Sequence, residues 1–306
     1  MNIFTIILPL VLVATLGFIC AKSQWLSRAQ IDALSKFTFY LSIPAFLFYQ
    51  MAKADLSGQV SPQFFAAFYL PVLCCYALAM LAHYLVKAKA SNNKSAAVFA
   101  LGASYSNTVI VGLPILLIAV GEQAIGITFL IITFHSMLLF ALTSAIAAKG
   151  TDKFSYAHFL IQNLKNPLVL SITLGLMVNL LGIELPNPIQ ETLAMLGKPA
   201  ITIALFILGA SLNHYRMTSQ ITLTLVACFH KLILLPCLVF MTAQYLFNLP
   251  SVTVAVLVVL SASPTGVNAY LIAQGQQQSQ EVVAGTVVLS TLLCIVTIPL
   301  WLMLVL

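Results

Sequence analysis

Long apolar segments constrain this chain more than any other feature of its sequence. A membrane-spanning helix needs about 20 consecutive apolar residues, whereas the strands of a membrane barrel alternate apolar and polar residues over shorter stretches. The continuous runs therefore predict an all-α integral membrane protein with ten transmembrane helices. We place these helices at residues 3–21, 34–52, 63–86, 95–119, 124–148, 163–181, 191–212, 219–245, 252–273 and 282–304.

The composition points the same way. Of the 306 residues, 61% are hydrophobic and 7% are charged, which is too little charge to cover a water-soluble globule. The basic residues fall mainly on one side of the expected membrane, where they predict cytoplasmic loops and two outward-facing termini. This distribution accounts for the net charge of +6 without a nucleic-acid partner. The basic residues on that side are Lys22, Arg28, Lys87, Lys89, Lys94, Lys149, Lys153, Lys165 and Arg216, against Lys53 on the other.

The two halves of the chain repeat one another. LPLVLVATLG at residues 8–17 is echoed by NPLVLSITLG at residues 166–175, and SMLL at 136–139 by STLL at 290–293. Residues 1–150 and 151–306 would then each hold five spans. Because five is odd, the second repeat inserts upside down relative to the first, which is an architecture of secondary transporters.

Corresponding spans of the two repeats carry helix-breaking residues at their centres. The fourth span reads SYSNTVIVGLPIL at residues 104–116, and the ninth reads LSASPTGVNAYLIAQ at residues 260–274. Paired Gly/Pro-interrupted spans are the best sequence pointer to a transporter's binding site. An alternative is that these residues only kink the helices for packing.

An interrupted helix exposes backbone N–H and C=O groups that lipid cannot satisfy. The freed N-terminal ends carry partial positive charge and suit a carboxylate. Serine, threonine and asparagine side chains nearby would orient it by hydrogen bonds. The candidate substrate-binding residues are Ser106, Asn107, Thr108, Gly112, Pro114, Ser263, Pro264, Thr265, Gly266 and Asn268.

Ionisable residues inside the membrane are costly and are functional candidates by default. The deep ones here are His135, Lys198, His230 and Lys231, with no deep Asp or Glu, which favours an anion as cargo. Lys231, His230 and His135 are possible charge partners for it. Lys231 could instead bond carbonyls released by a broken helix or act as a structural support, His135 could be a packing residue, and Lys198 suits a snorkelling role.

Four further motifs stand in this sequence: SNTVIVGLPILLIAVG at residues 106–121, NLKNPLVLSITLGL at 163–176, SKFTFYLSIPAFLF at 35–48 and IALFILGASL at 203–212. In these motifs the sequence resembles the auxin efflux carrier family, which includes the plant PIN proteins and a bacterial branch. The resemblance extends over essentially the whole chain.

The resemblance implies two inverted five-helix repeats with crossover helices 4 and 9, as in bile-acid carriers and sodium/proton antiporters. Residues 3–21, 34–52, 163–181 and 191–212 would form a scaffold that dimerises, and residues 63–148 and 219–304 a transport unit that moves like an elevator. The short connection between the repeats matches the bacterial branch. That branch implies location in the inner membrane and small organic acids such as malate or malonate as substrates.

Two other classes of function stay open. A membrane sensor or channel of the same fold would bind its ligand without pumping it. An intramembrane enzyme would need a converging nucleophile and base, and the sequence offers neither paired acids nor metal-ligand spacing, so we expect no enzyme, no metal and no cofactor. Coupling to sodium or to protons is undetermined by the sequence, since unwound carbonyls can coordinate sodium.

Overall fold

The computed structural model describes residues 3–54, 61–87, 92–147, 166–212 and 220–306. Within this part of the chain every regular element is helical, and the one extended pairing is a β-bridge between Ser106 and Thr265. The predicted all-α class is therefore confirmed. Residues 148–165, where the two predicted repeats join, lie outside the described residues.

Six helical stretches are long and apolar enough to cross a membrane by length and composition. They are Arg28–Lys53, Pro62–Lys87, Glu122–Ala147, Asn187–Leu212, Ile221–Leu246 and Gln280–Val305. Four shorter apolar helices accompany them at Leu8–Lys22, Thr108–Ala119, Pro167–Leu180 and Ser251–Ala262. A multi-pass membrane protein is thus confirmed, and the count of ten spans stays a prediction.

The helices of the first half run without long connections. They are α1 (Ile3–Lys22), α2 (Arg28–Phe37) continuing through the π-helical turn η1 (Thr38–Ser42) into α3 (Ile43–Lys53), α4 (Pro62–Lys87), α5 (Asn93–Ser104), the π-helical turn η3 (Thr108–Gly112), α6 (Leu113–Ala119), the 3₁₀ turn η4 (Glu122–Ala124) and α7 (Ile125–Ala147).

The second half has a similar order. It contains α9 (Pro167–Leu180), α10 (Asn187–Gly197), α11 (Ala200–Leu212), α12 (Ile221–Phe229) continuing through η5 (His230–Leu234), α13 (Leu235–Met241) and η6 (Thr242–Leu246), then α14 (Ser251–Ala262), α15 (Val267–Gln276) and α16 (Gln280–Val305).

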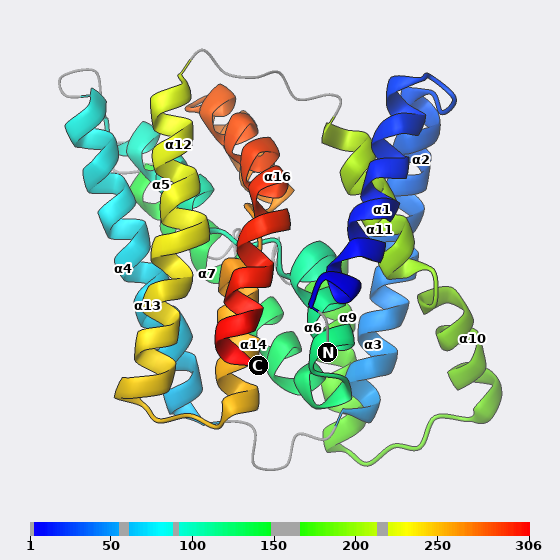
Figure 1. Cartoon of the computed structure of the whole chain (residues 1–306). Helices are drawn as coiled ribbons and strands as arrows, with labels where there is room; N and C mark the ends of the chain where they lie inside the picture. The colour runs from blue at the N-terminus through cyan, green and yellow to red at the C-terminus, as the bar shows by residue number, and fades with distance from the viewer. Residues whose placement is uncertain (1–2, 55–60, 88–91, 148–165, 213–219) are drawn as a thin grey trace.

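The helices pack in two groups (Figure 1). In one group α1 packs on α11, and α3 packs on both α9 and α10. In the other, α4 and α7 pack on α5, α12 and α14 pack on α16, and α13 packs on α14. The interrupted helices α5 and α14 are buried along nearly their whole length, so they are enclosed by protein and not by lipid.

Glycines allow close helix packing in the first group. A Cβ on Gly17 of α1 would lie 1.9 Å from the carbonyl oxygen of Phe206 on α11, and one on Gly175 of α9 would lie 2.6 Å from that of Phe48 on α3. Only a residue without a side chain fits at either contact. The same separation along the chain relates Gly17 to Gly175 and Phe48 to Phe206.

Candidate functional site

Two helix interruptions meet at the centre of the second helix group. Helix α5 ends before Tyr105, α14 ends before Ser263, and the residues that follow each end are extended. The backbone N–H of Asn107 donates to the carbonyl of Pro264 at 2.8 Å, and that of Gly266 donates to the carbonyl of Tyr105 at 3.1 Å. The two interruptions therefore satisfy part of one another's backbone.

Side chains from two further helices accept the next freed N–H groups. Ser106 N–H donates to Nε2 of His135 on α7 at 3.0 Å, and Thr265 N–H donates to Oγ of Ser290 on α16 at 3.0 Å. An acceptor Nε2 places the proton of the neutral imidazole on Nδ1. That ring also stacks on Tyr105, with centroids 5.1 Å apart and 10° between the planes. His135 thus holds the first interruption in place.

At each interruption, a side chain donates a hydrogen bond to a carbonyl that the broken helix leaves free. The hydroxyl of Thr265 donates to the carbonyl of Gly102 at 2.8 Å, and the ammonium of Lys231 donates to the carbonyl of Ser261 at 2.5 Å. In a continuous helix the carbonyl of Gly102 would accept from Ser106 N–H, and that of Ser261 from Thr265 N–H. Here both N–H groups donate to side chains, so the two carbonyls are free for other donors. Each broken helix consequently has a donor on its last turn.

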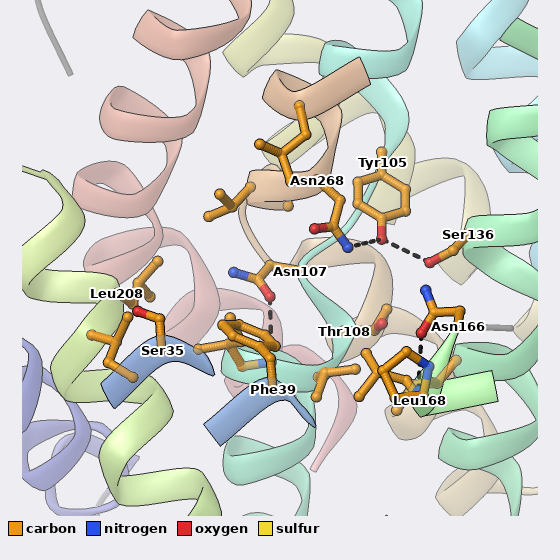
Figure 2. A pocket seen from close by; sticks show the side chains of 18 of the residues that line it. Ser35, Phe39, Tyr105, Asn107, Thr108, Ser136, Asn166, Leu168, Leu208 and Asn268 are labelled. Carbon is orange, nitrogen blue, oxygen red and sulfur yellow. Dashed lines mark hydrogen bonds between the residues drawn. The ribbon is translucent and has the colours of Figure 1, made fainter. Parts of the chain in front are cut away.

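A cavity of about 410 Å³ opens beside the crossing (Figure 2). This volume lies within the range of roughly 300–1,000 Å³ that small-molecule sites occupy. Its walls come from both interruptions and from α2, η1, α7, α9, α11 and α15. The lining residues are Ser35, Lys36, Phe39, Tyr40, Tyr105, Ser106, Asn107, Thr108, Val109, Ile110, Ile132, Ser136, Asn166, Pro167, Leu168, Val169, Ile207, Leu208, Ser211, Gly266, Val267, Asn268 and Leu271.

Asn107 presents an unused hydrogen-bond donor to this cavity. Its Oδ1 accepts from the backbone N–H of Ile110 at 3.3 Å, which caps the helix that follows and fixes the amide. Its Nδ2 has no partner among the described residues although the side chain is only 6% exposed. The Oγ of the adjacent Ser106 is likewise unpaired and buried. Unsatisfied buried donors of this kind indicate that a ligand or water completes the site.

A short chain of polar side chains lies across the cavity. The hydroxyl of Tyr105 is 2.8 Å from Oγ of Ser136, and Nδ2 of Asn268 approaches the same hydroxyl at 3.5 Å (Figure 2). The second distance is at the limit for a hydrogen bond, so Asn268 is less firmly held than Tyr105. Tyr105, Ser136 and Asn268 thus offer polar side-chain groups to a ligand in the cavity.

Half of the predicted binding residues reach the cavity. Ser106, Asn107, Thr108, Gly266 and Asn268 line it. The other predicted residues support the crossing from outside the cavity: Gly112, Pro114, Ser263, Pro264 and Thr265.

These five supporting residues make contacts within the crossing and not with the cavity. Thr265 and Pro264 bond to the opposite interruption, and the Ser263 hydroxyl bonds within its own helix to Val259. A Cβ on Gly112 would lie 2.8 Å from Oγ of Ser263. Pro114 lies near the start of α6, beyond the π-helical turn and not at the interruption itself.

The three possible charge partners do not line the cavity either. Lys231 is fully buried on the Ser261 carbonyl, and His135 is fully buried behind Ser106. His230 places Nδ1 2.8 Å from the carbonyl of Val226 in its own helix. Lys198 is exposed at the junction of α10 and α11.

Other lining residues were missed from the sequence. Asn166 caps α9 by accepting from the N–H of Leu168 at 2.9 Å, and it faces the cavity. The Asn-Pro pair at the start of an apolar run is a helix-capping signal that could have found it. Lys36 was overlooked because it falls inside the apolar segment 34–52, whereas it lies near the end of α2 with its side chain exposed.

A second cavity, of about 430 Å³, lies between α1, α11 and α16. Its lining is apolar except for Thr15, Thr291 and Cys294, which all bond to carbonyls of their own helices. It offers nothing to an anion. Among the described residues, no group of three or more His, Cys, Asp and Glu could hold a metal ion.

Comparison with known proteins places this geometry in context. A family model described as "Membrane transport protein" matches residues 2–302. A protein of Rhizobium meliloti (strain 1021) named "Putative malonate transporter" is 25% identical over 301 residues, covering 96% of this chain and 92% of its own length. The "Uncharacterized transporter YfdV" of Escherichia coli (strain K12) is 24% identical over 306 residues, covering 96% of this chain and 95% of its own.

Proposed function

Because the chain belongs to the membrane transport protein family that contains the auxin efflux carriers, we propose that it is a secondary active transporter of small organic anions. We assign mono- and dicarboxylates such as malate or malonate as its substrates. The cavity at the crossing is the binding site in this proposal, with Ser106, Asn107, Thr108 and Asn268 as direct contacts.

The observation that carries the proposal is the unpaired Nδ2 of Asn107. A buried Nδ2 with no acceptor among the described residues is suited to a carboxylate oxygen, since hydrogen bonds to charged groups contribute about 1.5–3 kcal/mol. The first turn of α15 adds the lining residues Val267 and Asn268, and the first turn of a helix exposes N–H groups and partial positive charge. Asn107 and the start of α15 therefore line the same cavity.

The charge of the lining supports an anion as well. Of the described residues that line the cavity, Lys36 carries a charge and none is Asp or Glu. A cation in the lining raises the local concentration of anions, and an apolar wall strengthens the attraction by excluding water. The similarity to a protein named for malonate agrees with a small dicarboxylate.

The proposed mechanism is alternating access by an elevator movement. The group containing α1, α3, α9, α10 and α11 would be the scaffold, and the group around α5 and α14 the moving unit. The equivalent glycine contacts at Gly17 and Gly175, and the matching donors at the two interruptions, support two inverted repeats. Dimerisation through the scaffold belongs to the same proposal.

We place the protein in a bacterial inner membrane with both termini outside. The support is the excess of Lys and Arg in loops on one side of the predicted spans. A channel or a sensor with the same fold is the alternative, and it would bind the anion without concentrating it. Among the described residues that line the cavity, no nucleophile is paired with a general base, so the site gives no support to an enzymatic role.

Uptake into liposomes tests the proposal. Labelled malonate and malate would be compared with indole-3-acetate and a neutral sugar, under imposed sodium, proton and voltage gradients in turn. Saturable accumulation of an organic acid but not of the sugar supports the carrier. Binding without accumulation under any gradient would favour the sensor, and flux that never exceeds equilibrium would favour the channel.

A further inference from the structure

The second cavity, of about 430 Å³, is bordered by helices of the proposed scaffold and of the proposed moving unit. Helices α1 and α11 form one wall, and the other wall consists of η3 and α6, which follow the first interruption, together with α16. Helices α1 and α16 also contact one another (Figure 1). A movement of one unit against the other would therefore change the shape of this cavity.

The lining of this cavity is suited to hydrocarbon and not to water. Its three polar side chains are hydrogen-bonded within their own helices: the hydroxyls of Thr15 and Thr291 donate to the carbonyls of Val11 and Val287 at 2.8 and 2.6 Å, and the thiol of Cys294 donates to Thr291. An apolar cavity whose polar groups are already bonded gives water no partners. An apolar ligand would restore the dispersion contacts that an empty space of this size lacks.

One side of the cavity is open to the surface that faces the membrane. Leu292 and Ile295 of α16 line the cavity and are 51% and 40% exposed. Leu12 and Leu16 are exposed beside the cavity on α1. Because α16 belongs to a helix long and apolar enough to cross a membrane, the medium at this opening is lipid tails.

A lysine lies one helical turn beyond the end of the cavity. Phe18 lines that end, and Nζ of Lys22 is 5.8 Å from the centroid of the Phe18 ring. Lys22 is exposed, as is Trp25 in the connection that follows. Lysine and tryptophan at the end of an apolar helix mark the level of the lipid headgroups, where an ammonium can pair with a phosphate.

The length of the cavity matches a lipid tail in one leaflet. Leu10 and Phe18 both line it, and they lie about 12 Å apart along α1 at ~1.5 Å per residue. The hydrocarbon core of a bilayer is about 30 Å thick, so one leaflet supplies tails of about 15 Å. A tail that enters beside Lys22 can therefore reach the whole length of this lining.

We propose that this cavity binds one acyl chain of a phospholipid whose headgroup phosphate pairs with Lys22. The bound chain also supports a wall of the other cavity. Val111 of η3 lines the lipid cavity while its neighbour Ile110 lines the substrate cavity, and Leu208 of α11 lines both. The consequence for transport, that a lipid fills the space between scaffold and moving unit, rests on the proposed function, whereas the binding of the lipid does not.

The test uses purified protein in detergent micelles with a trace of phosphatidylglycerol that carries a photoreactive diazirine in one acyl chain. Labelled peptides are mapped with and without an excess of unlabelled phosphatidylglycerol. Val288→Phe fills the cavity from α16, and Val296→Phe is the matched control, an exposed position of the same helix outside the lining. Lys22→Gln is compared with Lys53→Gln, an exposed lysine that lines neither cavity.

In the wild type we expect the label to concentrate in the cavity-lining peptides of α1, α11 and α16 and to be competed by unlabelled lipid. Val288→Phe should lower this labelling about threefold or more, since the larger side chain occupies the space, and Val296→Phe should not. Lys22→Gln should lower it about two- to fivefold, the worth of one exposed ion pair, and Lys53→Gln should not.

Three results would overturn the inference. One is wild-type label spread evenly over the exposed helix faces, or label that unlabelled lipid does not compete; this result decides the question even if Val288→Phe does not fold. Another is equal labelling of the wild type and a folded Val288→Phe protein. The third is an equal effect of Lys22→Gln and Lys53→Gln, which would remove the headgroup contact. None of these measurements uses malonate, so a failure to transport malonate would contradict the proposed function and leave the lipid site standing.

Discussion

The backbone N–H of Asn107 lies 2.8 Å from the carbonyl of Pro264, and this bond joins two segments that are 157 residues apart in the chain. It locks Asn107 at the crossing while the Asn107 side chain caps the following helix through Oδ1. The backbone N–H and the side-chain Oδ1 of Asn107 are therefore both hydrogen-bonded within the protein. Its Nδ2 is left to bind a ligand.

Asn107→Ala should reduce malonate transport by about 10- to 100-fold, the equivalent of one hydrogen bond to a charged group. Asn107→Asp should reduce it further, because a carboxylate there repels the substrate. Uptake into liposomes with equal amounts of inserted protein is the measurement. Uptake at the wild-type rate by either folded variant would remove Asn107 from the site.

Gly266→Ala should impair transport because its Cβ would lie 2.4 Å from Cε1 of Tyr105. The clash moves either the Tyr105 ring or the start of α15, and both line the cavity. Gly275→Ala is the matched control on the same helix, since its Cβ would meet nothing within 4 Å. We expect an uptake loss of at least tenfold for the first and no loss for the second; equal rates would show that the packing at Gly266 is not needed.

His135→Phe should destabilise the protein. The substitution keeps an aromatic ring at this position but removes the Nε2 that accepts from Ser106 N–H. Leaving a buried N–H unsatisfied costs about 1–3 kcal/mol. Ser290→Ala removes the corresponding acceptor for Thr265 and should have an effect of similar size. Thermal unfolding in detergent measures both, and an unchanged midpoint for His135→Phe would mean that water replaces the imidazole without loss.

Lys36→Gln should raise the KM for malonate several-fold with little change in kcat, because an exposed lysine in the cavity lining attracts the anion by its charge. The difference from wild type should shrink as ionic strength rises. Lys53→Gln, an exposed lysine that bonds to Tyr49 and is absent from the cavity lining, is the control. A salt-independent change, or one equal to that of Lys53→Gln, would contradict a role in attraction.

Local sequence signals predicted much of this architecture. Apolar length predicted a helical membrane protein, and Pro264 and Gly266 predicted the interruption after α14. The interruption after α5 falls at residues 105–107, before Gly112 and Pro114, so there the helix-breaking residues marked the span and not the break itself. Five of the ten proposed binding residues line the cavity, and all five lie at the interruptions or next to them.

Contacts between distant helices could not be predicted in the same way. A single sequence does not show that His135 accepts from Ser106, or that Thr265 turns its hydroxyl to Gly102 and away from the cavity. Asn166 joins the cavity because α9 begins there, and Lys36 because the continuous helical stretch Arg28–Lys53 passes beside it. These placements depend on packing between segments, which periodicity and spacing do not encode.

Calorimetric titration of malonate into the purified protein, wild type against Asn107→Ala, tests the central claim most directly. The claim predicts saturable 1:1 binding to each wild-type chain and a dissociation constant at least tenfold higher for Asn107→Ala, with both proteins folded. Equal affinity of the two proteins for malonate would contradict the claim that the crossing of the interrupted helices is the binding site.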